Sequence, residues 1–267
     1  MATMRSRLRN RLLVDIKALR AEVDVNFDAN PFRSLSKRFV IAAGARTGSN
    51  LLCERLLAHG AVVGESLLTH SVFAACKYHG TGLQRYCENY IESKTPGGVF
   101  GTKGSAALLA PLFLAQELPE FLGDWKFVYL YRVDVLKQAI SAVIAKETLS
   151  WRSSRTPTRA LSEEDFDGNK ILTNIKISLN TNKKWTDLFE LLSLEPFRVT
   201  YEDLAADPDV AAANVANYLG LPGLPITEKK FATPPLEVQA TSVNTIWEEK
   251  YRSLGLPLPE SIKEEDI

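Results

Sequence analysis

The segment from Gly44 to Asn50 reads G-A-R-T-G-S-N and has the composition of a loop that holds an anion. A continuous apolar run predicts a buried strand over Phe39–Ala43 before it, and leucines at helical spacing predict a helix over Asn50–His59 after it. Glycines let a chain wrap closely around a phosphate, and the first N–H groups of a helix carry partial positive charge. The loop is therefore predicted to bind an anionic group.

This loop differs from that of a nucleoside triphosphatase. Only three residues separate Gly44 from Gly48, and the lysine expected next to Ser49 is missing. Arg46 lies inside the loop instead, and a guanidinium group with a hydroxyl suits a 5′-phosphate that is held rather than cleaved. A nucleotide or small-molecule kinase is the weaker alternative, because the loop lysine and an obvious magnesium carboxylate are both lacking.

A second set of anion-binding residues follows the strand predicted over Lys126–Tyr131. Arg132 comes directly after that strand, and Ser141 lies nine positions further on, on a predicted helix that also carries Gln138. An arginine at a strand end and a serine on the next helix can close on one more phosphate. The spacing alone is common, and a surface arginine is the alternative interpretation.

Together with the Y-E-D-L-x-x-D-P segment from Tyr201 to Pro208, these motifs resemble the bacterial carbohydrate sulfotransferase family that includes trehalose and Nod-factor sulfotransferases. The resemblance covers Phe39–Gly64, Gly98–Lys103, Val128–Trp151, Tyr201–Pro208 and Trp247–Leu254. It implies an enzyme that moves a sulfuryl group from 3′-phosphoadenosine 5′-phosphosulfate (PAPS) to a hydroxyl of a carbohydrate or glycolipid by in-line displacement. It implies no metal ion.

The resemblance also implies roles for particular residues of the donor site. The 5′-phosphosulfate is expected to contact five consecutive residues, Arg46, Thr47, Gly48, Ser49 and Asn50. The 3′-phosphate is expected to contact Arg132 and Ser141. Asn50 replaces the hydroxyl residue that is usual in the family, and its amide can still donate a hydrogen bond.

Catalysis requires a base for the acceptor hydroxyl and cations for the charge that develops during transfer. Glu65, in the G-E-S-L-L segment, is the favoured base, and His70 is the rival. Lys103 resembles a family lysine that could neutralise the transferring group. A solvated carboxylate, an ordinary histidine and an exposed lysine are the alternative interpretations, and a donor-binding protein without catalysis stays open as an alternative function.

The rest of the chain predicts the frame for these residues. Further strands are expected over Gly98–Thr102 and Phe197–Tyr201, alternating with helices. The fold class is therefore α/β: a three-layer, mostly parallel central sheet flanked by helices, with the P-loop-like sulfotransferase fold that the resemblance implies. Residues 1–30 are expected to hold a basic amphipathic helix, residues 31–267 one α/β domain, and residues 150–168 a mobile loop or lid.

Composition limits the partners. The 267 residues include 32 lysines and arginines and 32 aspartates and glutamates, so the net charge gives no reason to expect a nucleic acid partner. The three cysteines lack metal-site spacing, and there is neither an apolar run of about 20 residues nor a secretory signal. We expect a cytoplasmic protein whose N-terminal helix contacts the inner membrane peripherally, packs on its own domain or forms a homodimer interface. Trp151, Tyr78 and Trp247 are candidates for an aromatic sugar-binding surface, or for core residues.

Overall fold

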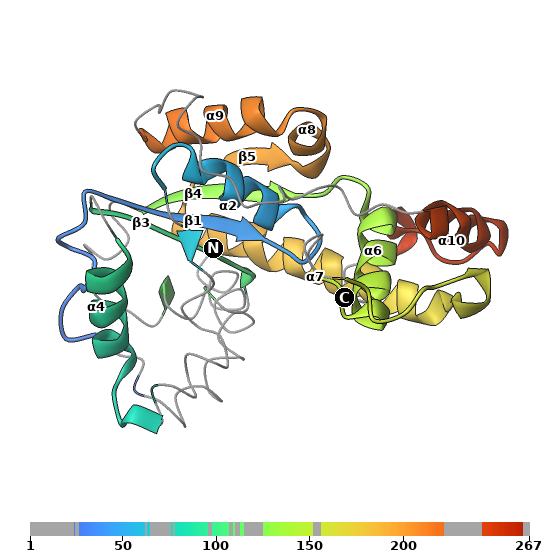
Figure 1. Cartoon of the computed structure of the whole chain (residues 1–267), viewed down its shortest axis with the longest axis horizontal. Coiled ribbons are helices and arrows are strands. Elements are labelled where there is room, and N and C mark those ends of the chain that lie inside the picture. The colour runs from blue at the N-terminus through green and yellow to red at the C-terminus, as the bar shows by residue number, and fades with distance from the viewer. Residues whose placement is uncertain are drawn as a thin grey trace.

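A five-stranded parallel sheet forms the centre of the described chain (Figure 1). The computed structural model describes residues 24, 27–61, 63–64, 76, 78–95, 98–106, 109, 113–114, 125–151, 156–221 and 242–263. The strands are β1 (Lys37–Ala43), β2 (Val63–Gly64), β3 (Val99–Gly104), β4 (Trp125–Tyr131) and β5 (Phe197–Thr200). They pair in the order β2-β3-β1-β4-β5, and every pairing is parallel. The predicted α/β fold with a parallel sheet is confirmed.

Helices cover both faces of the sheet and make three layers (Figure 1). The helices α2 (Ser49–Leu57), α8 (Tyr201–Ala206) and α9 (Pro208–Leu219) pack on one face, and α4 (Leu83–Lys94) and α7 (Gly168–Leu192) pack on the other. Successive side chains of β1 alternate between the two resulting cores, with Ile41 on the α2 side and Val40 on the α7 side. Both faces of β1 are therefore buried, which explains its uninterrupted apolar sequence.

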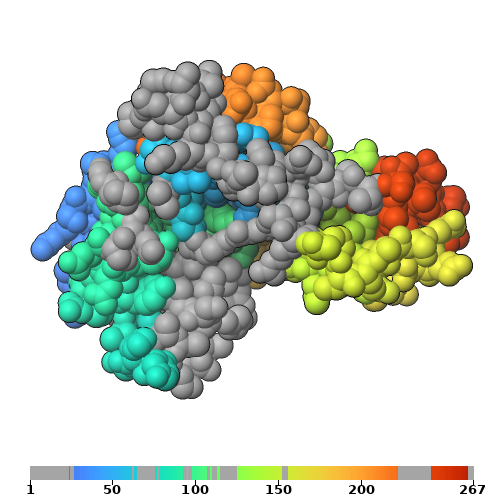
Figure 2. Space-filling model, in the orientation of Figure 1, coloured from blue at the N-terminus to red at the C-terminus, as the bar shows by residue number. Residues whose placement is uncertain are grey.

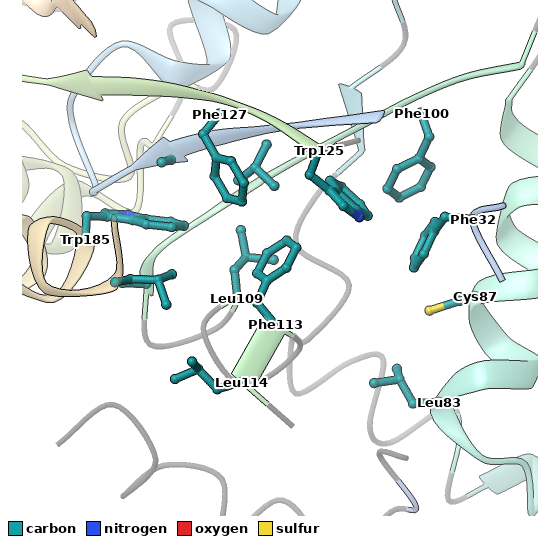
Figure 3. Close-up of a cluster of buried hydrophobic side chains, with 14 of the residues drawn as sticks. Phe32, Leu83, Cys87, Phe100, Leu109, Phe113, Leu114, Trp125, Phe127 and Trp185 are labelled. Atoms are coloured by element: carbon teal, nitrogen blue, oxygen red, sulfur yellow. The ribbon is translucent and has the colours of Figure 1, made fainter. Parts of the chain in front are cut away.

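The core on the α7 side is built largely from aromatic rings (Figure 3). The ring centroid of Trp125 lies 5.1 Å from that of Phe32 and 5.3 Å from that of Phe113, and both pairs meet edge to face. Trp185 stacks on Phe189 with centroids 5.5 Å apart. Edge-to-face and offset-stacked contacts between large rings stabilise this core beyond the area that they bury.

A third apolar cluster lies at one end of the molecule. It joins α6 (Val135–Thr148), the first half of α7 and α10 (Ser242–Ser253) with apolar residues that flank the 3₁₀ turns η3 (Glu163–Asp165) and η5 (Pro259–Ser261). Figure 2 shows the yellow and red segments packed into one lobe. Trp247 is fully buried in this cluster, and its indole Nε1 donates a hydrogen bond of 2.9 Å to Ser162 O. Trp247 is a core residue and cannot belong to an acceptor surface.

Two predicted segments differ from the structure. Residues 27–30 are not helical, and Phe27 packs in the aromatic core, so the main domain begins before residue 31. The predicted helix before residue 24 lies outside the described residues. The predicted mobile loop is tied to α6 in its second half, because Thr158 N donates to Thr148 O at 2.9 Å and Arg159 pairs with Glu147 at 2.8 Å. Among the described helices, none is long and apolar enough to cross a bilayer.

A substitution at Gly101 tests how tightly the side chains pack against the sheet. It pairs with Phe39 in β1, and a Cβ at Gly101 would lie 2.8 and 2.9 Å from Cε2 and Cε1 of that buried ring. We expect Gly101→Ala to lower the free energy of unfolding by about 1–3 kcal/mol, because the Phe39 ring has no room to move. Urea unfolding followed by circular dichroism measures this change.

Gly82→Ala is the matched control. Its added methyl group would have no neighbour closer than 3.6 Å, so its effect should be clearly smaller. If the free energy of unfolding fell equally in the two variants, the close packing at Gly101 would not be the cause of the loss.

Candidate functional site

The register of the sheet places the predicted anion-binding residues at one edge. Tyr131 of β4 pairs with Thr200 of β5, so the next residues along the two strands, Arg132 and Tyr201, leave the sheet side by side. Ala43 of β1 pairs with Leu130 of β4, so the loop after β1 leaves next to them. The carboxyl ends of parallel strands share one edge, which is where α/β proteins bind ligands.

The loop between β1 and α2 has the backbone of an anion-binding turn. Gly48 precedes α2 with a φ of 81°, a conformation that glycine adopts without strain. A Cβ at Gly48 would lie 3.0 Å from Tyr201 Cδ2, so the loop packs directly against the start of α8. Glycine has no side chain to cap α2, which leaves the first N–H groups of that helix to a ligand or to water.

Two polar side chains hold the loop in shape. The hydroxyl of Thr47 donates to Gly44 O at 3.0 Å, and the whole residue is buried. The amide Nε2 of Gln138, on α6, donates to Ala45 O at 2.7 Å. The buried side chain of Thr47 therefore closes the loop, and its contact with the donor stays a prediction.

Arg46 joins three parts of the molecule. Its Nε donates to Ser141 Oγ on α6 at 2.9 Å, and its Nη1 donates to Trp151 O at 2.9 Å. Its φ of 61° is unusual for a residue with a side chain, and such strain is typical of functional sites. Burial lowers the pKa of Arg46, Tyr201 opposes this shift, and the charge of Arg132 lowers the pKa further. The charge of Arg132 is the smallest of these three influences on Arg46.

Arg132 lies over the ring of Tyr201. Its guanidinium carbon is 4.3 Å from the ring centroid, a cation–π contact. Its buried Nε makes no hydrogen bond within the described part of the chain, and Glu202 Oε1 is 3.9 Å away, beyond hydrogen-bond range. Burial lowers the pKa of Arg132, and Tyr201 is the largest opposing influence. A buried guanidinium nitrogen without an acceptor is well placed to receive a phosphate oxygen.

Glu202 fixes the turn that carries Arg132. Its carboxylate accepts hydrogen bonds from Val133 N at 3.1 Å and Asp134 N at 3.2 Å. Asp134 in turn caps α6 by accepting a bond of 2.9 Å from Lys137 N. The start of α8 therefore positions both the arginine at the end of β4 and the helix that carries Ser141.

Lys103 and Asn50 meet on the other side of β1. The ammonium of Lys103 donates a hydrogen bond to Asn50 Oδ1. Lys103 belongs to β3 and is 9% exposed, so the alternative of an exposed surface lysine is wrong. This bond holds the buried ammonium beside the start of α2, next to the loop.

The structure brings most of the predicted site residues together. Arg46, Arg132 and Ser141 form one cluster, and Asn50 with Lys103 flanks the same loop. Glu65 and His70, the two candidate bases, lie outside the described residues. Among the described residues, no group of histidine, cysteine, aspartate and glutamate side chains could hold a metal ion.

Sequence reasoning missed three supporting roles. Tyr201 and Glu202 belong to a sequence motif, but nothing in the sequence shows that they pack against Arg132. Gln138 is predicted only as a helix residue, and its bond to the loop depends on how α6 lies against β1. The repeated occurrence of polar residues just after strands was the one signal that could have found Glu202.

Comparison with known proteins shows to which protein family the chain belongs. Residues 89–253, more than half of the chain, match the Stf0 sulphotransferase family. This chain therefore belongs to that family. A likeness to the sulfotransferase domain of the Synechococcus PCC 7002 olefin synthase supports the fold alone, with a TM-score of 0.50 and 14% identity over 87% of this chain and 98% of that one.

The chain is also similar in sequence to two trehalose 2-sulfotransferases. The chain is 29% identical over 185 residues to the trehalose 2-sulfotransferase of Mycobacterium tuberculosis strain Erdman, covering 61% of this chain and 66% of the relative. It is 28% identical over 193 residues to the trehalose 2-sulfotransferase of Mycolicibacterium smegmatis, covering 64% of this chain and 69% of the relative. The chain thus spans just under two thirds of the first relative's length.

Glu202 gives a test of how Arg132 is positioned. We expect Glu202→Gln to weaken binding of adenosine 3′,5′-bisphosphate about tenfold, because one of two charge-assisted hydrogen bonds to the turn is lost. Binding of AMP, which lacks the 3′-phosphate, should change much less. Isothermal calorimetry with both nucleotides gives the ratio of affinities.

Glu190→Gln removes the same charge from an exposed position near the end of α7 and serves as the control. An equal fall in affinity for both nucleotides in Glu202→Gln would mean a general loss of structure rather than misplacement of Arg132.

Proposed function

We propose that this protein transfers a sulfuryl group from PAPS to a hydroxyl of a carbohydrate or glycolipid acceptor. The observation that carries the proposal is the cluster of Arg46 and Arg132, two partly buried guanidinium groups beside a loop with the backbone of an anion-binding turn. Such a cluster suits a ligand with two separate anionic groups. PAPS has both, a 5′-phosphosulfate and a 3′-phosphate, whereas AMP has only one.

The donor would lie across the carboxyl edge of the sheet. Its 5′-phosphosulfate would meet the backbone N–H groups from Thr47 to Asn50 at the start of α2. Its 3′-phosphate would meet Arg132 and Ser141. Because Arg46 bonds to Ser141 Oγ, we place this arginine between the two phosphates, where it can contribute to either one.

The reaction would be an in-line displacement at sulfur. The acceptor hydroxyl oxygen forms a bond to sulfur while the bond from sulfur to the 5′-phosphate oxygen breaks, and adenosine 3′,5′-bisphosphate leaves. The proton of the hydroxyl passes to a base, for which Glu65 and His70 are the candidates. Lys103, held by Asn50, would offset the charge on the sulfuryl and leaving-group oxygens.

The acceptor, assembly and location are also proposals. The names of the two relatives favour a carbohydrate acceptor such as trehalose, and the basic N-terminal segment favours a homodimer or peripheral membrane contact for a cytoplasmic enzyme. Light scattering tests the dimer, and sedimentation with anionic vesicles tests the membrane contact.

Nucleotide binding is the first test of the proposal. In isothermal calorimetry, the protein should bind adenosine 3′,5′-bisphosphate in preference to AMP and to ATP with magnesium. Arg132→Ala should weaken bisphosphate binding about 10- to 100-fold, because a charged hydrogen-bond partner is lost. Arg85→Ala, at an exposed position on α4, is the control and should leave the affinity unchanged. Preference for ATP, or no binding of the bisphosphate, would refute the proposal.

The identity of the base is tested by turnover. If Glu65 is the base, Glu65→Gln should lower kcat by about 100-fold or more while bisphosphate affinity stays within about twofold. His70→Gln should then be nearly unaffected, and the opposite pattern would assign the role to His70. Tight bisphosphate binding without turnover of PAPS on any sugar, in the wild type, would instead identify a donor-binding protein that has lost catalysis.

A further inference from the structure

The helix α10 lies beside the start of α6 (Figure 1). Two fully buried aromatic residues anchor it: Trp247, whose indole Nε1 bonds to Ser162 O at 2.9 Å, and Tyr251 one turn later. Glu248 follows Trp247 directly, and its side chain is 18% exposed. Because the aromatic residues on both sides of it are fixed in the core, α10 holds the Glu248 carboxylate in a defined place against α6.

A series of charged contacts joins Glu248 to the turn that carries Arg132. The ammonium of Lys137, in the first turn of α6, lies 3.8 Å from Glu248 Oε2 and 3.3 Å from Asp134 Oδ2. Asp134 caps α6 and lies two residues after Arg132. The other carboxylate oxygen of Glu248 accepts a hydrogen bond of 3.0 Å from Arg252 Nη2, which orients the carboxylate on its own helix. Lys137 therefore bridges α10 and the cap of α6.

Two helices hold this turn from two sides. Glu202 of α8 accepts hydrogen bonds from two backbone N–H groups of the turn, whereas Glu248 of α10 reaches the side chain of Asp134 through Lys137. Burial lowers the pKa of Arg132, and the charge of Glu248 is among the influences that oppose this shift. The position of the turn thus depends on α10 as well as on α8.

We propose that Glu248 is a positioning residue of the proposed donor site, which ties α10 to the turn that places Arg132 against the 3′-phosphate. This inference rests on the proposed function and gives α10 a part in it. Glu248 acts through Lys137 without touching the donor. A carboxylate near a phosphate also weakens binding directly, but this one is partly exposed and has two cationic neighbours, so screening keeps the direct effect small. Loss of its charge should therefore weaken binding.

Nucleotide affinities of Glu248→Gln test this inference, because the substitution removes the charge and keeps the shape of the side chain. By isothermal calorimetry, we expect binding of adenosine 3′,5′-bisphosphate to weaken about five- to tenfold and binding of AMP, which lacks the 3′-phosphate, to change less than about twofold. Glu249→Gln makes the same change of charge at the exposed neighbouring position and should leave both affinities within about twofold. Unchanged or tighter bisphosphate binding in Glu248→Gln, or equal weakening for both nucleotides, would overturn the inference.

A double-mutant cycle with Lys137→Met tests the path of the effect. In this background, Glu248→Gln should change the bisphosphate affinity by less than about twofold, because the contact through which it acts is already missing. The full five- to tenfold loss in this background would show that Glu248 does not act through Lys137 and would overturn the inference. Failure of the wild type to bind the bisphosphate would refute the proposed function itself, whereas equal binding by the wild type and Glu248→Gln would refute only the role of Glu248.

Discussion

The convergence of two partly buried arginines at one edge of the sheet is the constraint on which the site depends. Burial lowers the pKa of both Arg46 and Arg132, and the charge of Arg132 lowers that of Arg46 further. A guanidinium group stays protonated at physiological pH, so this unfavourable energy cannot be relieved by losing a proton. The Tyr201 ring and the carboxylates of Asp134, Glu202 and Glu248 favour the charge on Arg132, and Ser141 accepts a hydrogen bond from Arg46. Two guanidinium groups in one cluster suit a ligand with two anionic groups better than either arginine does alone.

The sheet is what forces these charges together. Three neighbouring strands, β1, β4 and β5, end at the same edge, and the pairing of Tyr131 with Thr200 places the residues that follow them next to each other. The packing of Tyr201 against Gly48 then connects β5 to the loop after β1. One aromatic ring thereby contacts both the anion-binding loop and the second arginine. The free energy that keeps the arginines near each other comes from the two apolar cores that bury β1 on both faces, far from the charges themselves.

Local sequence patterns predicted the strands and the loop. The other contacts of the site depend on long-range packing, which those patterns do not show. β1 and the Gly44–Asn50 loop were predictable because a strand buried on both faces has an unmistakable apolar run, followed here by two glycines. The support that Glu202 gives to Arg132 was not predictable, because it requires the register of β4 against β5. The burial of Lys103 was missed for the same reason, since only pairing with β1 shows that it lies inside the sheet. Residues 150–168 are predicted as a mobile loop, because the ion pairs and caps in the second half of this segment follow no period in the sequence.

Arg46 connects the proposed donor site to the chain beyond the end of α6. Its guanidinium bonds at once to Ser141 on α6 and to the Trp151 carbonyl after that helix. If the donor draws this guanidinium toward a phosphate, the free energy of its bond to Trp151 changes as well. The lobe of α6, α7 and α10 limits how far Trp151 can respond, because its apolar core fixes the end of α6. Donor binding is therefore expected to change the contacts of Trp151 through one side chain while the surrounding frame stays rigid.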